Sequence, residues 1–491
     1  MSLTQSIRSS SKWLVSSNIV SQMLQFGFGI ALARLLVPAD FGMIVTIQIF
    51  TGFVSLVASG GMGQSLIRAK EASEKDFQVI FSMQLAIGVL IYAVLFTLAP
   101  WFSDWFHDPL YQDLLRVSAL SFLMRPFLNI HNIWLQREMR FKHNAMIGLA
   151  VNLISGVVSI AMAVSGFGVW SLVLGGLLGS VVSYFLVMRL TPMHSRLLFD
   201  REIAGKHSSF GFKIILNDLV SYMRRQTSNF IITKMAGANM VGLFNKGDSL
   251  AKLPFEMISG PIYQPVFRAM SVEQDNPDKI KYLFFRMTTL LLLYTLPIYI
   301  GLWWLAKPFI IVVYGEHWAD AAIPLQILAP LGLLYCVGHP CGAVLAATNR
   351  LGREAVIQAI TWAIVGFGCY FALDQDWGLA GVAYAIVLSQ IYSTTHFYLL
   401  ANQCYRARLS ELFAAVGPAL LLNAILIAAL VSLDFALPAG MREHAQKSYL
   451  VICALAGGLA YAAAFLFLPL PSLASEALRW KKLIRIAPQQ A

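Results

Sequence analysis

The chain has 491 residues, of which 58% are hydrophobic and 12% are charged, and its formal net charge is +11. The charged share is about half that of an average soluble protein, which excludes a water-soluble domain. The positive charge does not indicate nucleic acid as a partner, because the basic residues form short clusters between apolar runs, as in loops next to a membrane.

The apolar runs are long enough to cross a bilayer many times, since one transmembrane helix needs about 20 mostly apolar residues. We predict an all-α polytopic membrane protein with about 14 transmembrane helices. The first apolar run is longer than the core of a signal peptide and is expected to stay in the protein. In chain order the predicted helices cover residues 13–35, 41–62, 79–101, 113–134, 146–165, 170–189, 210–234, 240–263, 283–305, 321–345, 355–373, 379–401, 413–433 and 448–468.

Lysine and arginine fall mostly on alternate loops between these predicted helices. Because cytoplasmic loops are enriched in these residues, the pattern predicts that both termini lie in the cytoplasm. The loops on the opposite side, such as 102–113 and 314–322, are short and rich in aromatic and acidic residues. They leave no room for an extracytoplasmic domain.

An internal repeat appears when the sequence is shifted by 200 positions. SGGMGQSLIRA at 59–69 and SGPIYQPVFRA at 259–269 share the frame S-G-x3-Q-x3-R-A. The repeat predicts two lobes of six helices, 1–206 and 207–405, followed by two additional helices and a basic cytoplasmic tail in 406–491. Because six is even, both lobes enter the membrane in the same direction. Such a parallel pseudo-twofold repeat leaves a central cavity that suits alternating access.

No motif of a hydrolytic or metal-dependent enzyme occurs in the chain. It has no G-x4-G-K-[ST] phosphate loop, no H-E-x-x-H and no G-x-S-x-G. The five cysteines are an odd number without metal-ligand spacing, so small buried side chains explain them. We therefore expect no catalytic residue, no metal and no cofactor, and a protein that is not an enzyme.

Several charged residues lie inside the predicted helices. Each ionised group at bilayer depth costs about 3 kcal/mol unless it meets water, a partner or an anionic ligand. Two interpretations stay open: the charges pair across helices and fix the packing, or they line a hydrated cavity that receives an anion. Under the second interpretation the candidate substrate-binding residues are Arg34, Arg116, Arg125, Arg224, Arg225, Lys246 and Lys252.

Helical spacing separates these cations. Lys252 lies four residues from both Asp248 and Glu256, so these carboxylates can neutralise it locally. Arg224 and Lys246 have no acid at such a spacing that obviously neutralises them. They are therefore stronger candidates for an anion site than Lys252.

Two further features concern turns and kinks. Arg34 and Asp40 bracket a tight turn, where the arginine is expected to extend towards the membrane interface. Arg125 is followed by Pro126, and the matching place in the second lobe is His339, which precedes a proline. A proline at this depth either simply bends the helix or frees a carbonyl that faces a cavity.

The C-terminal segment 472–486, SLASEALRWKKLIRI, has the pattern of a basic amphipathic helix. Such a helix lies on the cytoplasmic leaflet and is attracted to anionic lipids. A basic flank that stops translocation is the alternative interpretation.

Five segments resemble one family of transporters. They are LARLLVPADFG (32–42), LQREMRFK (135–142), GFGVWSLVLG (166–175), MAGANMVGLFNKGDSLAKLP (235–254) and YGEHWADAAIPLQILAP (314–330). The chain is similar over nearly its whole length to the polysaccharide-transporter branch of the multidrug/oligosaccharidyl-lipid/polysaccharide (MOP) superfamily, especially to Wzx-type O-antigen and colanic-acid exporters.

The resemblance implies a flippase of the bacterial inner membrane. Its substrate would be an undecaprenyl-diphosphate-linked oligosaccharide, moved by alternating access from the cytoplasmic to the periplasmic leaflet for lipopolysaccharide or exopolysaccharide biosynthesis. The implied partners are this lipid-linked glycan, membrane lipids, and the polysaccharide polymerase and chain-length machinery.

One departure from the family concerns ion coupling. Many relatives carry an acid just before the asparagine that matches Asn229, whereas this chain has Ser228. If a proton or a sodium ion drives transport, Asp218, Asp248 or Asp40 must bind it instead.

Two alternative functions are a membrane-embedded enzyme and an exporter of another class of substrate. A membrane-embedded glycan polymerase or glycosyltransferase would need a large extracytoplasmic loop with catalytic groups, which this chain lacks. A small-molecule exporter of the same superfamily would favour an acidic cavity for cationic substrates, and the basic surplus argues against it.

Overall fold

The computed structural model describes residues 3–59, 62–69, 72–192, 195–348, 351–438 and 440–484, and all regular structure within these residues is helical. Of the repeated frame at 59–69, Gly60 and the side chains of Ser59, Gln64 and Arg68 lie outside the described part. The chain forms two compact units, Met1–Gly242 and Leu243–Ala491. Each unit is described by itself.

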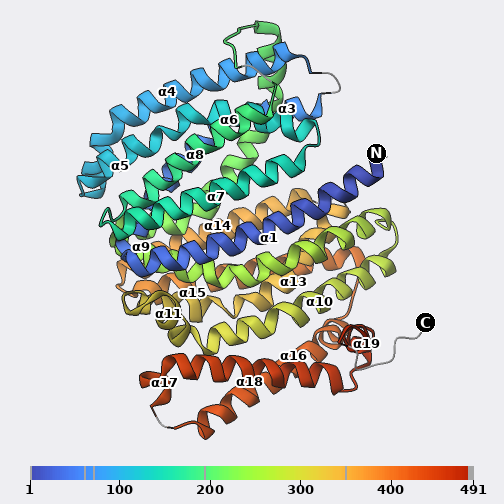
Figure 1. Cartoon of the computed structure of the whole chain (residues 1–491). Helices are drawn as coiled ribbons and strands as arrows, with labels where there is room; N and C mark the ends of the chain where they lie inside the picture. The colour runs from blue at the N-terminus through green and yellow to red at the C-terminus, as the bar shows by residue number, and fades with distance from the viewer. Residues whose placement is uncertain are drawn as a thin grey trace. The chain divides into compact units, whose positions relative to one another are not determined.

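The described residues of the first unit form eight helices and the beginning of a ninth (Figure 1). They are α1 (Leu3–Leu35), α2 (Pro38–Ser59), α3 (Met62–Arg68), α4 (Glu74–Phe106), α5 (Leu110–Ala119), α6 (Ser121–Arg137), α7 (Phe141–Val164), α8 (Trp170–Leu190) and α9 (Arg201–Val272).

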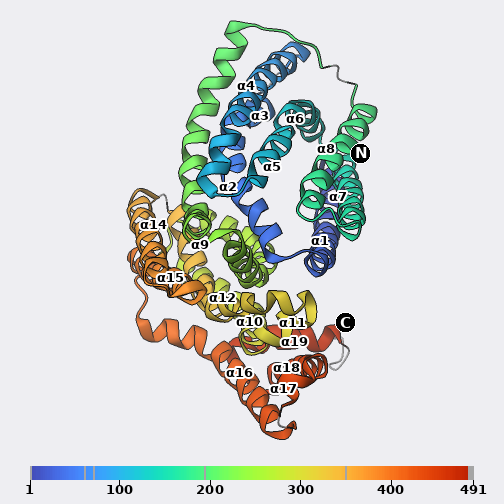
Figure 2. The same cartoon turned by 90° about the vertical axis from the view of Figure 1, so that its left-hand side faces the viewer.

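The second unit begins in α9 and ends with a short helix near the C-terminus (Figure 2). Its further helices are α10 (Pro277–Trp304), α11 (Ala306–Tyr314), η1 (Glu316–Ala321), α12 (Ala322–Leu328), α13 (Leu331–Ala347), α14 (Leu351–Asp374), α15 (Gly378–Tyr405), α16 (Leu409–Ala436), α17 (Met441–His444), α18 (Gln446–Phe467), η2 (Pro471–Leu473) and α19 (Ala474–Leu483).

Helix α9 consists of two helices that meet at Gly237. Gly237 has φ 80° and ψ −179°, a conformation that is essentially restricted to glycine. The break lies between the predicted crossings 210–234 and 240–263. The residues up to 242 pack within the first unit, while the lobe boundaries drawn from the sequence repeat stay a prediction.

The order of elements repeats between the units. A long helix (α4, α10) is followed by an interrupted one (α5–α6, α12–α13) and by a helical hairpin (α7–α8, α14–α15). In each unit the two helices of the hairpin lie side by side. Helices α16 and α18 are additional, and they pack on each other and on α10.

Length and apolar composition identify eight described helices that can cross a membrane, and nine if η1–α12 and α13, bent by 50°, form one span. The interrupted pairs correct the expectation of continuous helices at 113–134 and 321–345. Large apolar side chains such as Phe367 and Phe435 are 78% and 88% exposed, as expected for groups that face lipid. The count of fourteen crossings stays a prediction.

The connector between α8 and α9 is fastened to the first unit by polar contacts. The Thr191 hydroxyl lies 2.7 Å from Nδ1 of the buried His131, and Lys75 Nζ lies 3.2 Å from a carboxylate oxygen of Asp200. Asp200 also accepts the backbone N–H of Ile203 at the start of α9. This N–H, together with Lys75, holds the pKa of Asp200 below its ordinary value.

Candidate functional site

Helices α2 and α9 cross with their backbones in contact in the first unit. A Cβ atom at Gly42 would lie 1.7 Å from the Ala238 carbonyl oxygen, and one at Gly242 would lie 2.0 Å from that of Pro38. No side chain fits in this space, so both positions require glycine. The crossing therefore fixes how the N-terminal part of α2 meets α9.

Buried hydroxyl groups follow this crossing along α2. The Thr46 hydroxyl donates to the Gly42 carbonyl at 2.8 Å and accepts from the Tyr111 hydroxyl at 3.3 Å. It also lies 3.4 Å from the hydroxyl of Thr233. All three hydroxyl-bearing residues are at most 3% exposed, so α2, α5 and α9 meet through polar groups inside a membrane-spanning region.

The polar contact continues about three turns away from Thr233, towards the N-terminus of α9. Tyr222 donates from its hydroxyl to the Gln48 carbonyl at 2.6 Å, beside Gly52, where a Cβ atom would lie 2.0 Å from that hydroxyl. Gln226 donates to Tyr222 at 3.4 Å, and Asn229 donates to Gln226 at 2.9 Å. We call these contacts and those of Thr46 the α2–α9 seam.

Our sequence reasoning did not single out this seam, although a signal was present. Its α9 members, Tyr222, Gln226, Asn229 and Thr233, are spaced by four, three and four residues, which places them on one helical stripe. The search for charged side chains overlooked neutral ones.

Arg125 reaches the same part of α2 from helix α6. Its Nη1 donates to the Ser55 hydroxyl, and its guanidinium lies 5.0 Å from the Phe122 ring centroid. Within the described residues no carboxylate lies at ion-pair distance from it. Since Gly52 and Ser55 are three residues apart on α2, they share a face, and Arg125 and Tyr222 converge there.

The other α9 candidates of the first unit lie near Tyr222 in the chain. Asp218 and Arg224 are half-buried and Arg225 is exposed. Arg225 follows Tyr222 by three residues and therefore shares its side of the helix. Arg225 therefore lies on the side of α9 from which Tyr222 contacts α2.

Two further candidates of the first unit, Arg116 and Asp40, have local contacts of their own. The Arg116 guanidinium lies 4.3 Å from the ring centroid of Phe96. Arg34 is exposed in the last turn of α1. Asp40 accepts the Val37 backbone N–H at 3.2 Å, so its carboxylate caps the start of α2. These contacts give Arg116 and Asp40 structural roles.

In the C-terminal part of α9, two lysines have partners of different kinds. Lys246 Nζ lies 4.8 Å from the Tyr314 ring centroid and 4.9 Å from that of Trp318. Two aromatic faces stabilise a desolvated ammonium by about 2 kcal/mol. Lys252 Nζ lies 2.5 Å from a carboxylate oxygen of Asp248, which is the local pairing that the spacing allowed.

His339 lies in an aromatic surrounding on α13. Its ring centroid is 4.6 Å from that of Tyr263 and 5.2 Å from that of Phe255. The buried Nδ1 atom has no hydrogen-bond partner among the described residues. Pro340 follows it, as Pro126 follows Arg125, so matching helices of the two units carry a proline behind a nitrogen-rich side chain.

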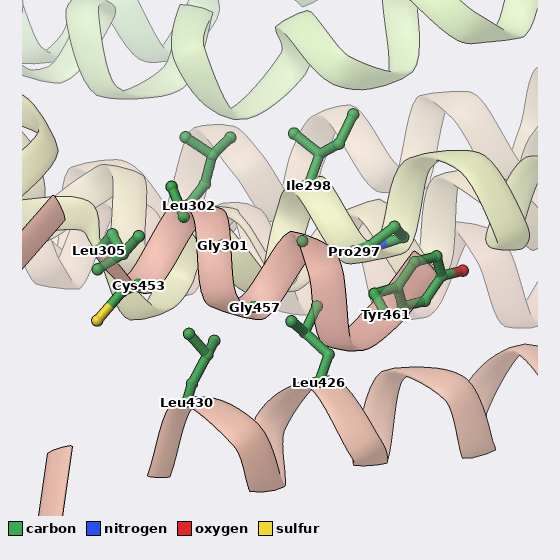
Figure 3. A pocket seen from close by; sticks show the side chains of 12 residues that line it. Pro297, Ile298, Gly301, Leu302, Leu305, Leu426, Leu430, Cys453, Gly457 and Tyr461 are labelled. Atoms are coloured by element: carbon green, nitrogen blue, oxygen red, sulfur yellow. The ribbon is translucent and has the colours of Figure 1, made fainter. Parts of the chain in front are cut away.

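An apolar pocket of about 330 Å³ lies between α10, α16 and α18 (Figure 3). Gly301 and Gly458 border open space, because no atom lies within 4 Å of a Cβ atom added at either. The Tyr461 hydroxyl at its edge donates to the Leu293 carbonyl at 2.7 Å. The pocket therefore suits a hydrocarbon chain and offers nothing to a polar group.

The described residues contain no group of three or more His, Cys, Asp and Glu side chains that could hold a metal ion. The five cysteines are free thiols.

The model of the family described as "Polysaccharide biosynthesis protein" matches residues 31–323, which is more than half of the chain. The chain is 23% identical over 415 residues to the lipopolysaccharide biosynthesis protein WzxC of Escherichia coli K12, covering 82% of each chain. It is 25% identical over 470 residues to the teichuronic acid biosynthesis protein TuaB of Bacillus subtilis 168, covering 94% of this chain and 95% of TuaB.

Two solved structures share the fold. The lipid II flippase MurJ in an inward closed conformation superposes with a TM-score of 0.74 at 16% identity, over 96% of this chain and 99% of that chain. A multidrug resistance MATE family transporter of the MOP superfamily in an inward-facing conformation gives 0.60 at 17% identity, over 80% and 95%. Together with the apolar spans, these likenesses establish a multi-pass membrane protein of the MOP fold.

Proposed function

The chain belongs to the polysaccharide biosynthesis protein family, and from this premise we propose that it is a lipid-linked oligosaccharide flippase. Its cargo is an undecaprenyl-diphosphate-linked glycan, carried from the cytoplasmic to the periplasmic leaflet of the bacterial inner membrane. The names of the succinoglycan biosynthesis transport protein ExoT of Rhizobium meliloti and of the flippase MurJ support a transporter rather than an enzyme. Both termini lie in the cytoplasm.

One observation carries the proposal: Arg125 lies inside the first unit without a carboxylate among its described neighbours. An unneutralised cation in a membrane-spanning helix is costly unless it meets water or an anion. A diphosphate is such an anion, and guanidinium groups bind phosphate oxygens in pairs of parallel hydrogen bonds. Arg125, Arg224 and Arg225 are therefore the proposed head-group ligands.

The lysines of the second unit take a structural role in this proposal. Two aromatic rings stabilise Lys246 and a carboxylate pairs with Lys252, so both charges are stabilised without a ligand. The substrate-binding set suggested by the sequence thus narrows to the arginines next to the α2–α9 seam.

The lipid tail needs no polar carrier. It stays in the hydrocarbon core while the head group crosses, and the apolar pocket bordered by Gly301 and Gly458 can hold part of it. Only the charged head group then has to be shielded from hydrocarbon, and the lipid tail adds no desolvation cost.

Coupling to a proton or sodium gradient is assigned to Asp218. Asp248 pairs with Lys252 and Asp40 caps α2, whereas no such contact of Asp218 is found among the described residues. A potential of 100 mV supplies about 2.3 kcal/mol per charge that moves across the membrane. Asp218→Asn should leave exchange across vesicles intact and abolish its acceleration by an imposed gradient.

A reconstitution experiment tests the flippase. Purified protein is placed in vesicles that contain a lipid-linked oligosaccharide with a fluorophore on the glycan, and a membrane-impermeant quencher reports the outer-leaflet fraction. We expect wild-type protein to equilibrate the leaflets and Arg125→Met to slow this strongly, whereas Lys447→Met, at the start of α18, serves as the matched control. Rates equal to those of protein-free vesicles would refute the function.

A genetic experiment identifies the glycan. Deleting the gene should cause an undecaprenyl-linked intermediate to accumulate on the cytoplasmic side, and its sugars define the physiological cargo. If no such intermediate accumulates, polymerase and chain-length proteins are not downstream partners and the assignment to surface polysaccharide is wrong.

A further inference from the structure

The short C-terminal helix α19 is fastened to α10 by a buried carboxylate. Glu476 is only 7% exposed and forms an ion pair with Arg286 through Oε1. Its other oxygen accepts a hydrogen bond from the Tyr294 hydroxyl at 3.3 Å. A carboxylate buried among these partners fixes one face of α19 to α10.

A second contact fixes the rotation of α19. The Trp480 indole N–H donates to the Tyr294 hydroxyl at 3.0 Å. Directly before α19, Leu473 is buried in a cluster with Leu293 and Leu422. Polar and apolar contacts therefore place the same face of the helix against the membrane-spanning bundle, and the opposite face must point away from it.

The exposed side chains of α19 are apolar and basic. Leu478 and Leu483 are 49% and 66% exposed, and the side chain of Arg479 is 73% exposed. Lys481 and Lys482 lie on the last turn, and the only acid in α19, Glu476, lies 3.9 Å from Arg479 as well as pairing with Arg286. Exposed leucines beside basic groups that outnumber the one acid are typical of a helix that lies in a membrane interface.

We propose that this exposed face binds anionic phospholipids. Helix α18, an apolar span, ends at Phe467, and α19 begins at Ala474, so α19 lies at the level of the head groups. In this arrangement Arg479 and Lys482 contact lipid phosphates while Leu478 and Leu483 enter the acyl region. The ion pair and the Tyr294 hydrogen bonds set the rotation that makes this possible. The inference does not depend on the flippase activity.

Lipid retention on the intact protein tests the binding. The protein is purified from nanodiscs of equal phosphatidylglycerol and phosphatidylcholine content, and native mass spectrometry counts the lipids that stay bound. We expect a preference for phosphatidylglycerol, which Arg479→Gln with Lys482→Gln lowers about thirtyfold, since each basic group contributes five- to sixfold. The control Lys447→Gln removes an exposed charge at the other end of α18 and should keep the preference.

Two outcomes would overturn the proposal. If the wild type retains the two lipids equally, the exposed face does not select anionic phospholipids, and its basic residues would bind a protein partner instead. Displacement of phosphatidylglycerol by soluble pyrophosphate would show that the site recognises a diphosphate rather than a phospholipid in the membrane.

The fastening is tested separately by hydrogen exchange of residues 471–484 in the full-length protein. Glu476→Gln should raise the exchange rate of this segment at least tenfold and weaken the lipid preference. The charge swap Arg286→Glu with Glu476→Arg should restore both. Unchanged exchange in Glu476→Gln would show that the ion pair does not hold α19, and a loss of protection without any loss of lipid preference would refute the link between them.

Discussion

The two parts of α9, before and after Gly237, differ in how their polar side chains are stabilised inside the membrane. Before Gly237, α9 meets α2 through the neutral hydroxyl groups of Thr233 and Tyr222. After Gly237 and the glycine crossing that follows it, Lys246 and Lys252 each have a partner: aromatic rings for Lys246 and a carboxylate for Lys252. Neutral contacts can separate without exposing an unpaired charge, so the first part is better suited to movement and the second to rigidity.

The same contrast recurs on α6 and α13. Arg125 has a permanent charge and only a hydroxyl and a ring as described neighbours, whereas His339 can lose its proton and lies among aromatic rings. An arginine cannot neutralise itself to escape desolvation, so its presence at this position requires an anion or water. The prolines of α6 and α13 thus follow side chains of different chemistry in the two units.

The largest effect is expected at the glycine crossing. Gly42→Ala places a methyl group 1.7 Å from a carbonyl oxygen, so α2 and α9 must separate, and overpacking of this kind costs about 3 kcal/mol or more. Thermal unfolding in detergent, with size-exclusion profiles for protein that fails to fold, measures the loss. Gly148→Ala on α7, which has open space around its Cβ position, is the control. Equal stability of Gly42→Ala and Gly148→Ala would show that the close approach of α2 and α9 at Gly42 does not limit the stability of the protein.

Arg125→Met should come next and should affect transport rather than folding. Losing a charge-assisted contact of about 1.5–3 kcal/mol lowers the flipping rate roughly ten- to a hundredfold. Arg125→Lys should recover part of the rate, since the charge returns without the planar fork. The vesicle assay and a melting curve of the same preparation separate the two effects. Normal flipping by Arg125→Met would disprove the head-group assignment.

Lys246→Met should show the reverse pattern. Removing the ammonium from between Tyr314 and Trp318 is expected to lower the unfolding free energy by about 1–2 kcal/mol and to change the flipping rate by less than twofold. Lys246→Arg should keep the stability. If Lys246→Met lost flipping strongly at unchanged stability, Lys246 would be a ligand of the anion site and not a structural residue.

The smallest effect is expected for the pair Asp248 and Lys252. A double-mutant cycle with Asp248→Asn and Lys252→Met should give a coupling of about 0.5 kcal/mol, because the two residues are neighbours on one helix and Lys252 is exposed. Chemical denaturation of the four proteins measures it. A coupling several times larger would mean that this pair is desolvated and that it contributes more to stability than its exposure indicates.

Composition and periodicity determined the class of the molecule. Runs of about 20 apolar residues can only become membrane-spanning helices, and the residues that break them already indicated the division of α9 near Gly237. The repeat frame and the family resemblance likewise follow from residue order. Sequence also gave a complete inventory of charges inside these helices, because a rare side chain in an apolar run is visible without coordinates.

Only the tertiary structure decided which of those charges are engaged. Lys246 and Trp318 are 72 positions apart in the chain, as Arg125 and Ser55 are 70, and no local pattern predicts contacts between helices so distant. Spacing could foresee Asp248–Lys252 because both groups lie on one helix. The α2–α9 seam and the docking of α19 by Glu476 depend instead on where separate helices come together, which is set by packing of the whole bundle and not by any single segment.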